Sequence, residues 1–165
     1  MSEVKQFSLT IKLRFGLLLL AASLVGLDQW TKYLARHILS VFEVKRFLPL
    51  WDWTLVYNQG AAFSFLAQQG GWQRIFFVAI SAIVSLFLLY YLLRNNYSRI
   101  AGIAFSLILG GAVGNLIDRA LVGRVTDFIA WHVGEHYWPA FNVADSCVSI
   151  GVALLLIENI FWAKK

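Results

Sequence analysis

Two aspartates in this chain stand beside long apolar segments, where a carboxylate is costly and therefore indicates function. They are Asp127, in "GRVTDF", and Asp145, in "FNVADS". Two carboxylates held close together cannot both ionise cheaply, so such a pair tends to share one proton. The charged member can then take a proton from water while the neutral member donates a hydrogen bond to a carbonyl oxygen. If the fold brings these two side chains together, they have the chemistry of acid–base hydrolysis.

Local structure offers a simpler explanation for Asp145 but not for Asp127. Asn142 and Asp145 in "NVAD" have the spacing of a helix N-cap and the third helical position, so Asp145 could serve only as a cap. Asp127 lies among apolar neighbours such as Val125 and Phe128, and it has no obvious local partner. The capping alternative therefore stays open for Asp145 alone.

A second candidate group is "DQWTK", in which Asp28 and Lys32 are four residues apart. On a helix the two side chains share one face and can form an ion pair, with the Lys32 ammonium reaching along the helix to the membrane interface. Alternatively, Asp28 orients a substrate or a neighbouring polar side chain. The spacing fits both interpretations.

A third group, "GGAVGNLIDR", combines small and polar residues at the end of an apolar run. Its glycines, Gly111 among them, let another helix or an extended chain approach closely, and helix packing is the simpler interpretation. Asp118 and Arg119 follow Asn115 by three and four residues, so the three side chains line one face at the helix end. Polar groups at membrane depth are costly, which favours a functional role for this face.

The segment "HVGEH" matches the spacing of a zinc peptidase motif. On a helix, His132 and His136 would share a face and bind zinc, with Glu135 as the base. Against this, Gly134 interrupts a helix that Pro139 soon ends, and no third ligand follows nearby. We therefore favour a polar interfacial loop and expect neither a metal nor a cofactor.

The elements that must position these residues follow from a very apolar composition. The chain has 165 residues, of which 59% are hydrophobic and 14% charged, and its mean hydropathy is +0.67. Soluble domains carry roughly 25% charged residues, so this chain has too little polar surface to cover a globule in water. The composition predicts an integral membrane protein, mainly α-helical because a helix satisfies its own backbone groups in lipid.

Four apolar runs predict four transmembrane helices in a single membrane domain, residues 1–165, since one span needs about 20 residues. The first and last runs fit only if their polar members lie near a surface or face other helices. The first run could instead be a cleaved signal peptide, but "AASLVGLDQ" is a poor cleavage site and the helical pattern continues past it. The predicted spans cover residues 15–36, 75–93, 100–118 and 140–163.

Basic residues near the span ends predict the orientation of the chain. They precede the first span, fill the short loop between the second and third, and close the chain. These three places share one side of a four-span protein, so both termini are expected in the cytoplasm and the aspartates 28, 127 and 145 toward the outer face. The basic residues are Lys5, Lys12, Arg14, Arg94, Arg99, Lys164 and Lys165.

Two outer segments connect the spans, residues 37–74 and 119–139. Within the first, "WDWTLVY" alternates bulky and polar residues and is rich in β formers. Within the second, "RVTDFIAW" is a candidate for another short strand. We expect a small extracytoplasmic sheet whose aromatic side chains rest at the level of the lipid headgroups.

Five motifs occur in order along the chain: "DQWTK", "NQGAAFSF", "GGAVGNLIDR", "GRVTDF" and "FNVADS". Each is weak alone, but five in sequence on four apolar spans are highly specific. Together they make the chain resemble the bacterial lipoprotein signal peptidases (signal peptidase II) over nearly its whole length. No departure is visible in any of the five blocks.

The resemblance implies an aspartyl endopeptidase in which Asp127 and Asp145 are the catalytic pair. Such enzymes remove the signal peptide from a diacylated prolipoprotein, cutting just before the lipidated cysteine at the outer face of the bacterial inner membrane. The implied partners are this substrate and membrane lipid, with no cofactor, and we expect a monomer whose outer sheet forms a cradle over the site. The match also assigns support or substrate contact to Asp28, Lys32, Asn58, Gly111, Asn115, Arg119 and Asn142.

Other classes of function fit this sequence less well. An ion-coupled transporter would place acidic residues at mid-depth and show a two-fold repeat, whereas these acids gather near one surface. A non-catalytic assembly subunit does not explain Asp127 and Asp145 together. A nucleic-acid-binding role requires a clustered basic face, and the net charge of +5 is instead spread over both ends and several loops.

Overall fold

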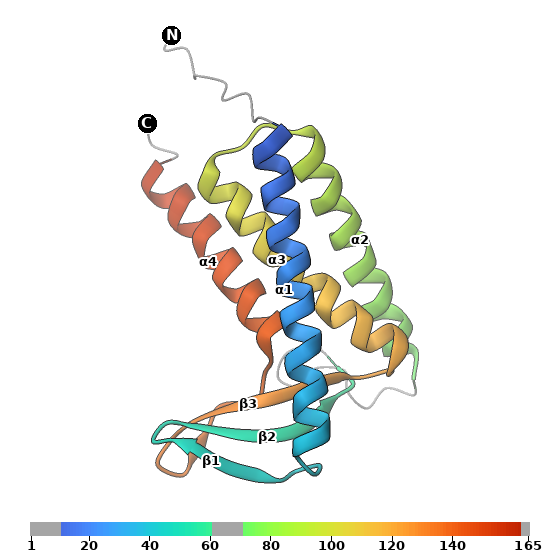
Figure 1. The fold of residues 1–165 in the computed structure, drawn as a ribbon, viewed down its shortest axis with the longest axis vertical. Coiled ribbons are helices and arrows are strands. Elements are labelled where there is room, and N and C mark those ends of the chain that lie inside the picture. Colours follow the sequence, from blue (N-terminus) through green and yellow to red (C-terminus); the bar gives the residue numbers. More distant parts are fainter. Residues whose placement is uncertain (1–10, 61–70, 163–165) are drawn as a thin grey trace.

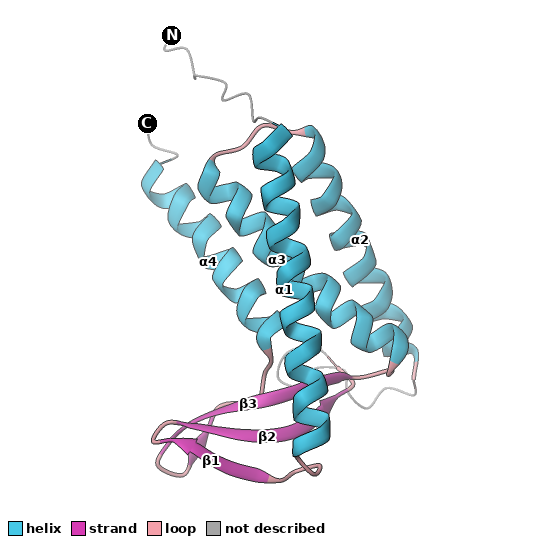
Figure 2. Ribbon diagram, in the orientation of Figure 1, coloured by secondary structure: helices cyan, strands magenta, loops and turns pink. Residues whose placement is uncertain are grey.

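The computed structural model describes residues 11–60 and 71–162, which form a bundle of helices with a small sheet across one end (Figure 1, Figure 2). The chain alternates between the two parts, so both the first and the third helix lead directly into strands. The elements in order are α1 Ile11–Ile38, β1 Val44–Leu48, β2 Trp51–Asn58, α2 Trp72–Arg94, α3 Arg99–Leu121, β3 Val125–Val133, β4 His136–Tyr137 and α4 Val143–Trp162.

Helix α3 is the centre of the bundle. It packs against α1, α2 and α4. In its most apolar stretch 50% of the residues are buried, whereas in those of α2 and α4 only 17% are. Among the described residues, α2, α3 and α4 are long and apolar enough to cross a membrane. The expected combination of apolar helices with a small antiparallel sheet is therefore confirmed, while a fourth span in α1 stays a prediction.

Arginine side chains close two helix ends that would otherwise leave backbone carbonyls unpaired. Arg74, in the first turn of α2, donates hydrogen bonds to the carbonyls of Arg119 (3.0 Å) and Ala120 (2.8 Å) in the last turn of α3. At the opposite end of the bundle, Arg14 donates to the carbonyl of Leu92, near the end of α2, at 2.6 Å. The helices are thus tied to one another at both ends.

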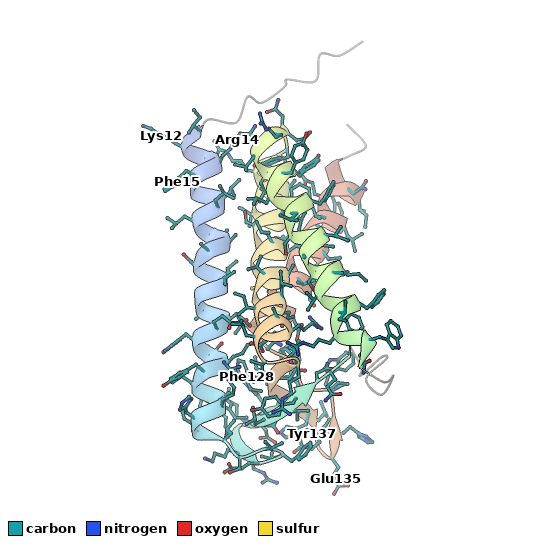
Figure 3. The ribbon with its side chains drawn as sticks, turned by 90° about the vertical axis from the view of Figure 1, so that its right-hand side faces the viewer. Lys12, Arg14, Phe15, Phe128, Glu135 and Tyr137 are labelled. Atoms are coloured by element: carbon teal, nitrogen blue, oxygen red, sulfur yellow. The ribbon has the colours of Figure 1, made fainter. Side chains whose placement is uncertain are left out.

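The four strands form an antiparallel sheet in the order β1-β2-β3-β4. A register shift between Trp53 and Val56 turns Leu55 toward the helices. Leu55 packs there with Phe128 of β3 and with Ala35 from the last turns of α1. Phe128 accordingly lies between the bundle and the sheet (Figure 3). This apolar contact fixes β3, and hence Asp127, relative to α1.

The strands appear where the sequence predicted them, in "WDWTLVY" and "RVTDFIAW", but the sheet also includes β1 and β4. The helical interpretation of "HVGEH" is wrong. His132 and His136 lie on opposite strands of a hairpin, with Gly134 in the turn at a φ of 61°. A zinc-binding helix face is therefore not formed. The part of "NQGAAFSF" after Gly60 lies outside the described residues.

Candidate active site

Asp127 on β3 and Asp145 in the first turn of α4 are joined by one residue, Asn142. The Asn142 amide donates to Asp127 Oδ1 at 2.7 Å, and the Asn142 backbone N–H donates to Asp145 Oδ2 at 3.2 Å. In return, Asn142 Oδ1 accepts from the Asp145 N–H at 2.9 Å. The predicted capping contacts between Asn142 and Asp145 are therefore present, and the same cap brings the Asp145 carboxylate toward Asp127.

Asn115 on α3 orients the second carboxylate from the other side. Its amide Nδ2 donates to Asp145 Oδ1 at 2.8 Å. Its Oδ1 accepts from Lys32 Nζ at 2.9 Å and from Asn142 Nδ2 at 3.3 Å. Because Lys32 can only donate, it fixes which way the Asn115 amide points. The amide nitrogen is thereby directed at Asp145.

Lys32 and Asp28 form the predicted ion pair, with Nζ 2.8 Å from Asp28 Oδ2. The prediction that Lys32 reaches to the interface is wrong, because its side chain is fully buried and directed at α3. A charge withdrawn from water needs several polar partners, and Lys32 finds them in Asp28, Asn115 and, at 3.5 Å, Asp118. Asp28 also accepts from the N–H of Ala144 at 2.9 Å, so it stabilises the start of α4.

Asp118, predicted from its spacing to share a helix face with Asn115 and Arg119, belongs to this network. It is 1% exposed, and its Oδ2 accepts from the N–H of Thr126 at 2.9 Å. Its Oδ1 lies 3.6 Å from Arg36 and 3.5 Å from the Gln29 amide. Asp118 therefore attaches the end of α3 and the outer part of α1 to the residue directly before Asp127. Its three-residue spacing from Asn115 in the sequence already indicates that the two side chains share a helix face.

Arg119 and Asn58 lie at the border of the site, next to Gly60, the last described residue after β2. Arg119 Nη2 donates to the carbonyl of Gly60 at 3.1 Å, and its guanidinium lies 5.3 Å from the centroid of the Phe77 ring. Its Nε is buried and has no partner within the described residues. Asn58 accepts from the Gly60 N–H at 2.9 Å and hydrogen-bonds Asp127. Both side chains therefore flank the carboxylate pair.

Gly111 acts on the site through helix packing. A Cβ added at this position would lie 2.3 Å from the carbonyl oxygen of Ala144 and 2.8 Å from a methyl group of Val148. At Gly114 an added Cβ would lie 2.6 Å from Asp28 Oδ2. The absence of side chains on this stretch of α3 lets the start of α4 and the Asp28 carboxylate approach closely.

The surroundings of Asp127 raise the pKa of its carboxyl group. It is 3% exposed, and this burial, reinforced by the charge of Asp145, raises its pKa from the ordinary 3.8 to about 7. Hydrogen bonds from Asn142 and Asn58 and the charge of Lys32 act in the opposite direction but are outweighed. Asp127 therefore holds a proton at a pH where an ordinary aspartate is ionised. One neutral and one charged carboxyl group can serve as acid and base.

Comparisons with known proteins agree on one family. The family model described as signal peptidase (SPase) II matches residues 20–161. A lipoprotein signal peptidase of Acinetobacter baumannii is 46% identical over 142 residues, covering 86% of this chain and 81% of the relative. One of Coxiella burnetii is 49% identical over 139 residues, covering 84% and 85%. A solved structure described as a bacterial membrane enzyme superposes with a TM-score of 0.79 at 33% identity, covering 88% and 87%.

Proposed function

The chain belongs to the signal peptidase II family, and from that premise we propose that Asp127 and Asp145 are its catalytic pair. It is a membrane-embedded protease of lipoprotein processing. The observation that carries the assignment is the hydrogen bonding of both carboxyl groups to Asn142, together with the raised pKa of Asp127. The substrate is a diacylated prolipoprotein, cut just before its lipidated cysteine.

The two carboxyl groups take different roles because their surroundings differ. Asp127, which is neutral up to a pH of about 7, donates a hydrogen bond to the carbonyl oxygen of the bond to be cut. Asp145 lies in the first turn of α4, where the helix dipole favours a negative charge, so it takes a proton from the attacking water. The roles then exchange, and Asp145 returns a proton to the departing amine.

The side chains around the pair hold it in this state. Asn115, itself fixed by Lys32, directs an amide donor at Asp145 and leaves that carboxylate oriented toward the attacking water. The buried Nε of Arg119, which has no partner in the described chain, is available to a substrate carbonyl or to the tetrahedral intermediate. A preorganised donor of this kind stabilises the developing negative charge.

We also propose that α1 is the fourth span. It runs beside α3 within the bundle (Figure 1), and its polar pair, Asp28 and Lys32, is buried against the other helices. The surface that α1 turns outward carries apolar side chains, both near its start, at Phe15 and Leu19, and beside the buried pair, at Leu27. Lipid can therefore surround α1 without meeting its charges.

We further propose that the site lies at the outer face of the bacterial inner membrane, with both termini in the cytoplasm. In support, Lys12 and Arg14 lie at the end of the bundle away from the sheet (Figure 3), where basic residues mark the cytoplasmic side. The predicted basic residues at 5, 164 and 165 lie outside the described residues. A single copy supplies both carboxyl groups, which supports action as a monomer in contact with lipid.

Incubation of the purified protein with a diacylated prolipoprotein, in lipid, tests this function directly. We expect cleavage immediately before the modified cysteine, and much slower cleavage of the same precursor without the diacylglyceryl group. Mass spectrometry of the released signal peptide locates the cut. Cleavage at another bond, or equal rates for both precursors, contradicts the proposed substrate.

A further inference from the structure

A cavity of about 690 Å³ opens at the free end of the outer sheet, away from the carboxylate pair. It lies between the turn that joins β1 to β2 and the hairpin of β3 and β4. Its walls are almost entirely aromatic and aliphatic. The lining residues are Leu48, Pro49, Leu50, Trp51, Trp131, His132, Val133, His136, Tyr137 and Trp138.

The walls of this cavity, which we call the tip pocket, are held in place by a buried carboxylate. Asp52 on β2 is fully buried, and its Oδ2 accepts from the Tyr137 hydroxyl at 2.9 Å. His132 Nε2 lies 3.4 Å from the same oxygen. The His132 and Tyr137 rings also stack, with centroids 4.9 Å apart. The hairpin is thereby fixed against the central strand, so the tip pocket is a built feature of the sheet.

The rim of the tip pocket exposes more apolar surface than a water-facing sheet tolerates. Trp131 is 56% exposed, Trp138 57% and Val133 72%. Contiguous exposed apolar side chains mark a surface that meets a partner or a membrane. Tryptophan in particular is enriched at membrane–water interfaces, where its apolar ring enters lipid and its N–H stays near water.

The position of the hairpin points to the membrane as that partner. Figure 1 shows the strands crossing the end of the bundle and the hairpin extending sideways beyond α4, so the tip is not covered by the helices. On α1, Trp30 and Tyr33 are 58% and 53% exposed beside the buried Lys32, as expected of an interfacial level. These two exposed aromatic side chains place an interfacial level on the part of α1 that carries the buried Lys32.

Charge at the rim suits an anionic headgroup. Arg46 is exposed on β1, directly across from Asp52 in the register, and Asp52 accepts from the Tyr137 hydroxyl of the pocket wall. A phosphate beside Arg46 would leave its acyl chains next to the aromatic lining. A peptide partner would instead need polar groups in the pocket, yet the Tyr137 hydroxyl is already engaged by Asp52.

We propose that the tip pocket docks the outer sheet on the bilayer by accepting acyl chains of membrane phospholipid, with Arg46 beside the anionic headgroup. This contact would hold β3, and with it the strand that carries Asp127, at a fixed height over the membrane. The docking does not require catalysis, so its failure and that of the proposed activity are separable.

A spin label at Val133 tests the proposal without an activity readout. Because Cys147 is the one cysteine of the sequence, Val133→Cys in a Cys147→Ala background carries a single label. The protein is placed in nanodiscs of phosphatidylcholine and phosphatidylglycerol, and collision with oxygen is compared with collision with a water-soluble nickel chelate. Leu86→Cys on α2 gives the lipid reference and Ser40→Cys the reference outside the bundle, both positions being exposed.

We expect the ratio of oxygen collision to nickel-chelate collision to be several-fold higher for the Val133 label than for the Ser40 label. It should approach the ratio for the Leu86 label. The Trp131→Ser/Trp138→Ser double variant should lower the ratio at Val133, whereas Trp72→Ser, an exposed tryptophan at the start of α2, should not. Equal nickel access at Val133 and Ser40 overturns the proposal. It is also overturned if protection at Val133 requires added precursor, or if it increases with protein concentration through spin–spin coupling between copies.

Discussion

The half of the bundle away from the sheet is held together by apolar packing, whereas the half beside the sheet buries charges. Leu17, Leu88 and Leu92 form the core of the first half. At the corresponding depth in the second half, Lys32 and Asp118 are buried just as completely. Apolar packing would stabilise the second half at least as well. The buried charges are therefore explained by what they position, which is the carboxylate pair at the mouth of α4.

This contrast predicts different consequences of substitution in the two halves. An apolar side chain loses contacts in proportion to its volume, and its neighbours can partly relax. A buried polar side chain leaves its partner unpaired when it is removed. Changes beside the sheet should therefore act on turnover first, and changes in the apolar half on stability first.

The largest effect is expected for the carboxylate pair itself. Asp127→Asn and Asp145→Asn keep nearly the same shape, so insertion and packing should survive, but an amide cannot act as the base or share the proton. Each single variant should lose turnover by roughly 10²–10⁴-fold, the usual worth of acid–base help. Because the two groups act as one unit, the double variant should be little worse.

The measurement is cleavage of the diacylated precursor by membranes that contain equal amounts of each variant. Glu135→Gln, at the exposed turn of the hairpin (Figure 3), is the matched control because it removes a carboxylate far from the site. Near-normal turnover by either aspartate variant would show that the aspartyl mechanism is wrong.

The next largest effect is a loss of activity at alkaline pH. Because the pKa of Asp127 is raised to about 7, kcat/KM should fall about tenfold per pH unit above that value, as the neutral acid is lost. Asn58→Ala removes a hydrogen bond that lowers this pKa, so the descending limb should move to higher pH. If the descending limb of the pH profile does not move, Asn58 does not hydrogen-bond the group whose ionisation limits activity.

The same pKa change affects folding in a direction that can be stated. Between the ordinary value of 3.8 and about 7, the folded protein binds more protons at Asp127 than the unfolded chain does. This group's contribution to the free energy of unfolding therefore falls as the pH rises through that window. The Asp127→Asn variant should lack this part of the dependence in thermal unfolding.

Asp118→Asn should have a smaller effect on turnover than a change in the pair. The amide keeps the shape but weakens the bonds to Lys32 and to the Thr126 N–H, so β3 is held less firmly while both carboxyl groups of the pair remain. We expect about a tenfold loss of turnover, below the roughly 10²–10⁴-fold of acid–base catalysis. Complete loss in folded protein would assign Asp118 a role in the reaction itself.

Leu92→Ala tests the apolar half of the bundle, where a substitution should change stability and leave turnover nearly unchanged. Leu92 is 1% exposed, and truncating such a side chain costs about 2–5 kcal/mol of unfolding free energy. The melting temperature should fall, while kcat/KM and its pH dependence at low temperature should stay near normal. A shifted pH profile would mean that the two halves are coupled.

Local spacing predicted much of the site because several of its contacts are local. The four-residue spacing of Asp28 and Lys32 predicted their ion pair, and the spacing in "NVAD" predicted the reciprocal cap of α4. The alternation in "WDWTLVY" predicted β2. The assignment of Asp127 and Asp145 as catalytic came from the resemblance, and it stays a prediction.

What the sequence could not supply were partners far along the chain. Lys32 was expected to reach the membrane interface, because its local sequence shows only one partner, Asp28. Its acceptor Asn115 and its second carboxylate, Asp118, belong to another helix. The alternation in "WDWTLVY" likewise does not indicate that Asp52 is buried and accepts a hydrogen bond from the Tyr137 hydroxyl, 85 residues further along the chain. Strand β1 was not predicted. All five of its residues are exposed, so its sequence lacks the alternation of buried and exposed side chains that indicates a strand.

The smallest effect is expected for the two histidines that suggested a metal. In the hairpin, His132 lies against Asp52 and His136 pairs with Val133, so the two imidazoles do not share a helix face. The His132→Ala/His136→Ala variant should therefore keep most of its precursor cleavage, and a strong chelator should not inhibit the normal protein. The assay compares both proteins with and without chelator at equal amounts. In the proposed mechanism the carboxylate pair supplies both acid and base, so no step depends on these side chains. Inhibition by the chelator that added zinc reverses would overturn this conclusion and return the hairpin to the chemistry of the site.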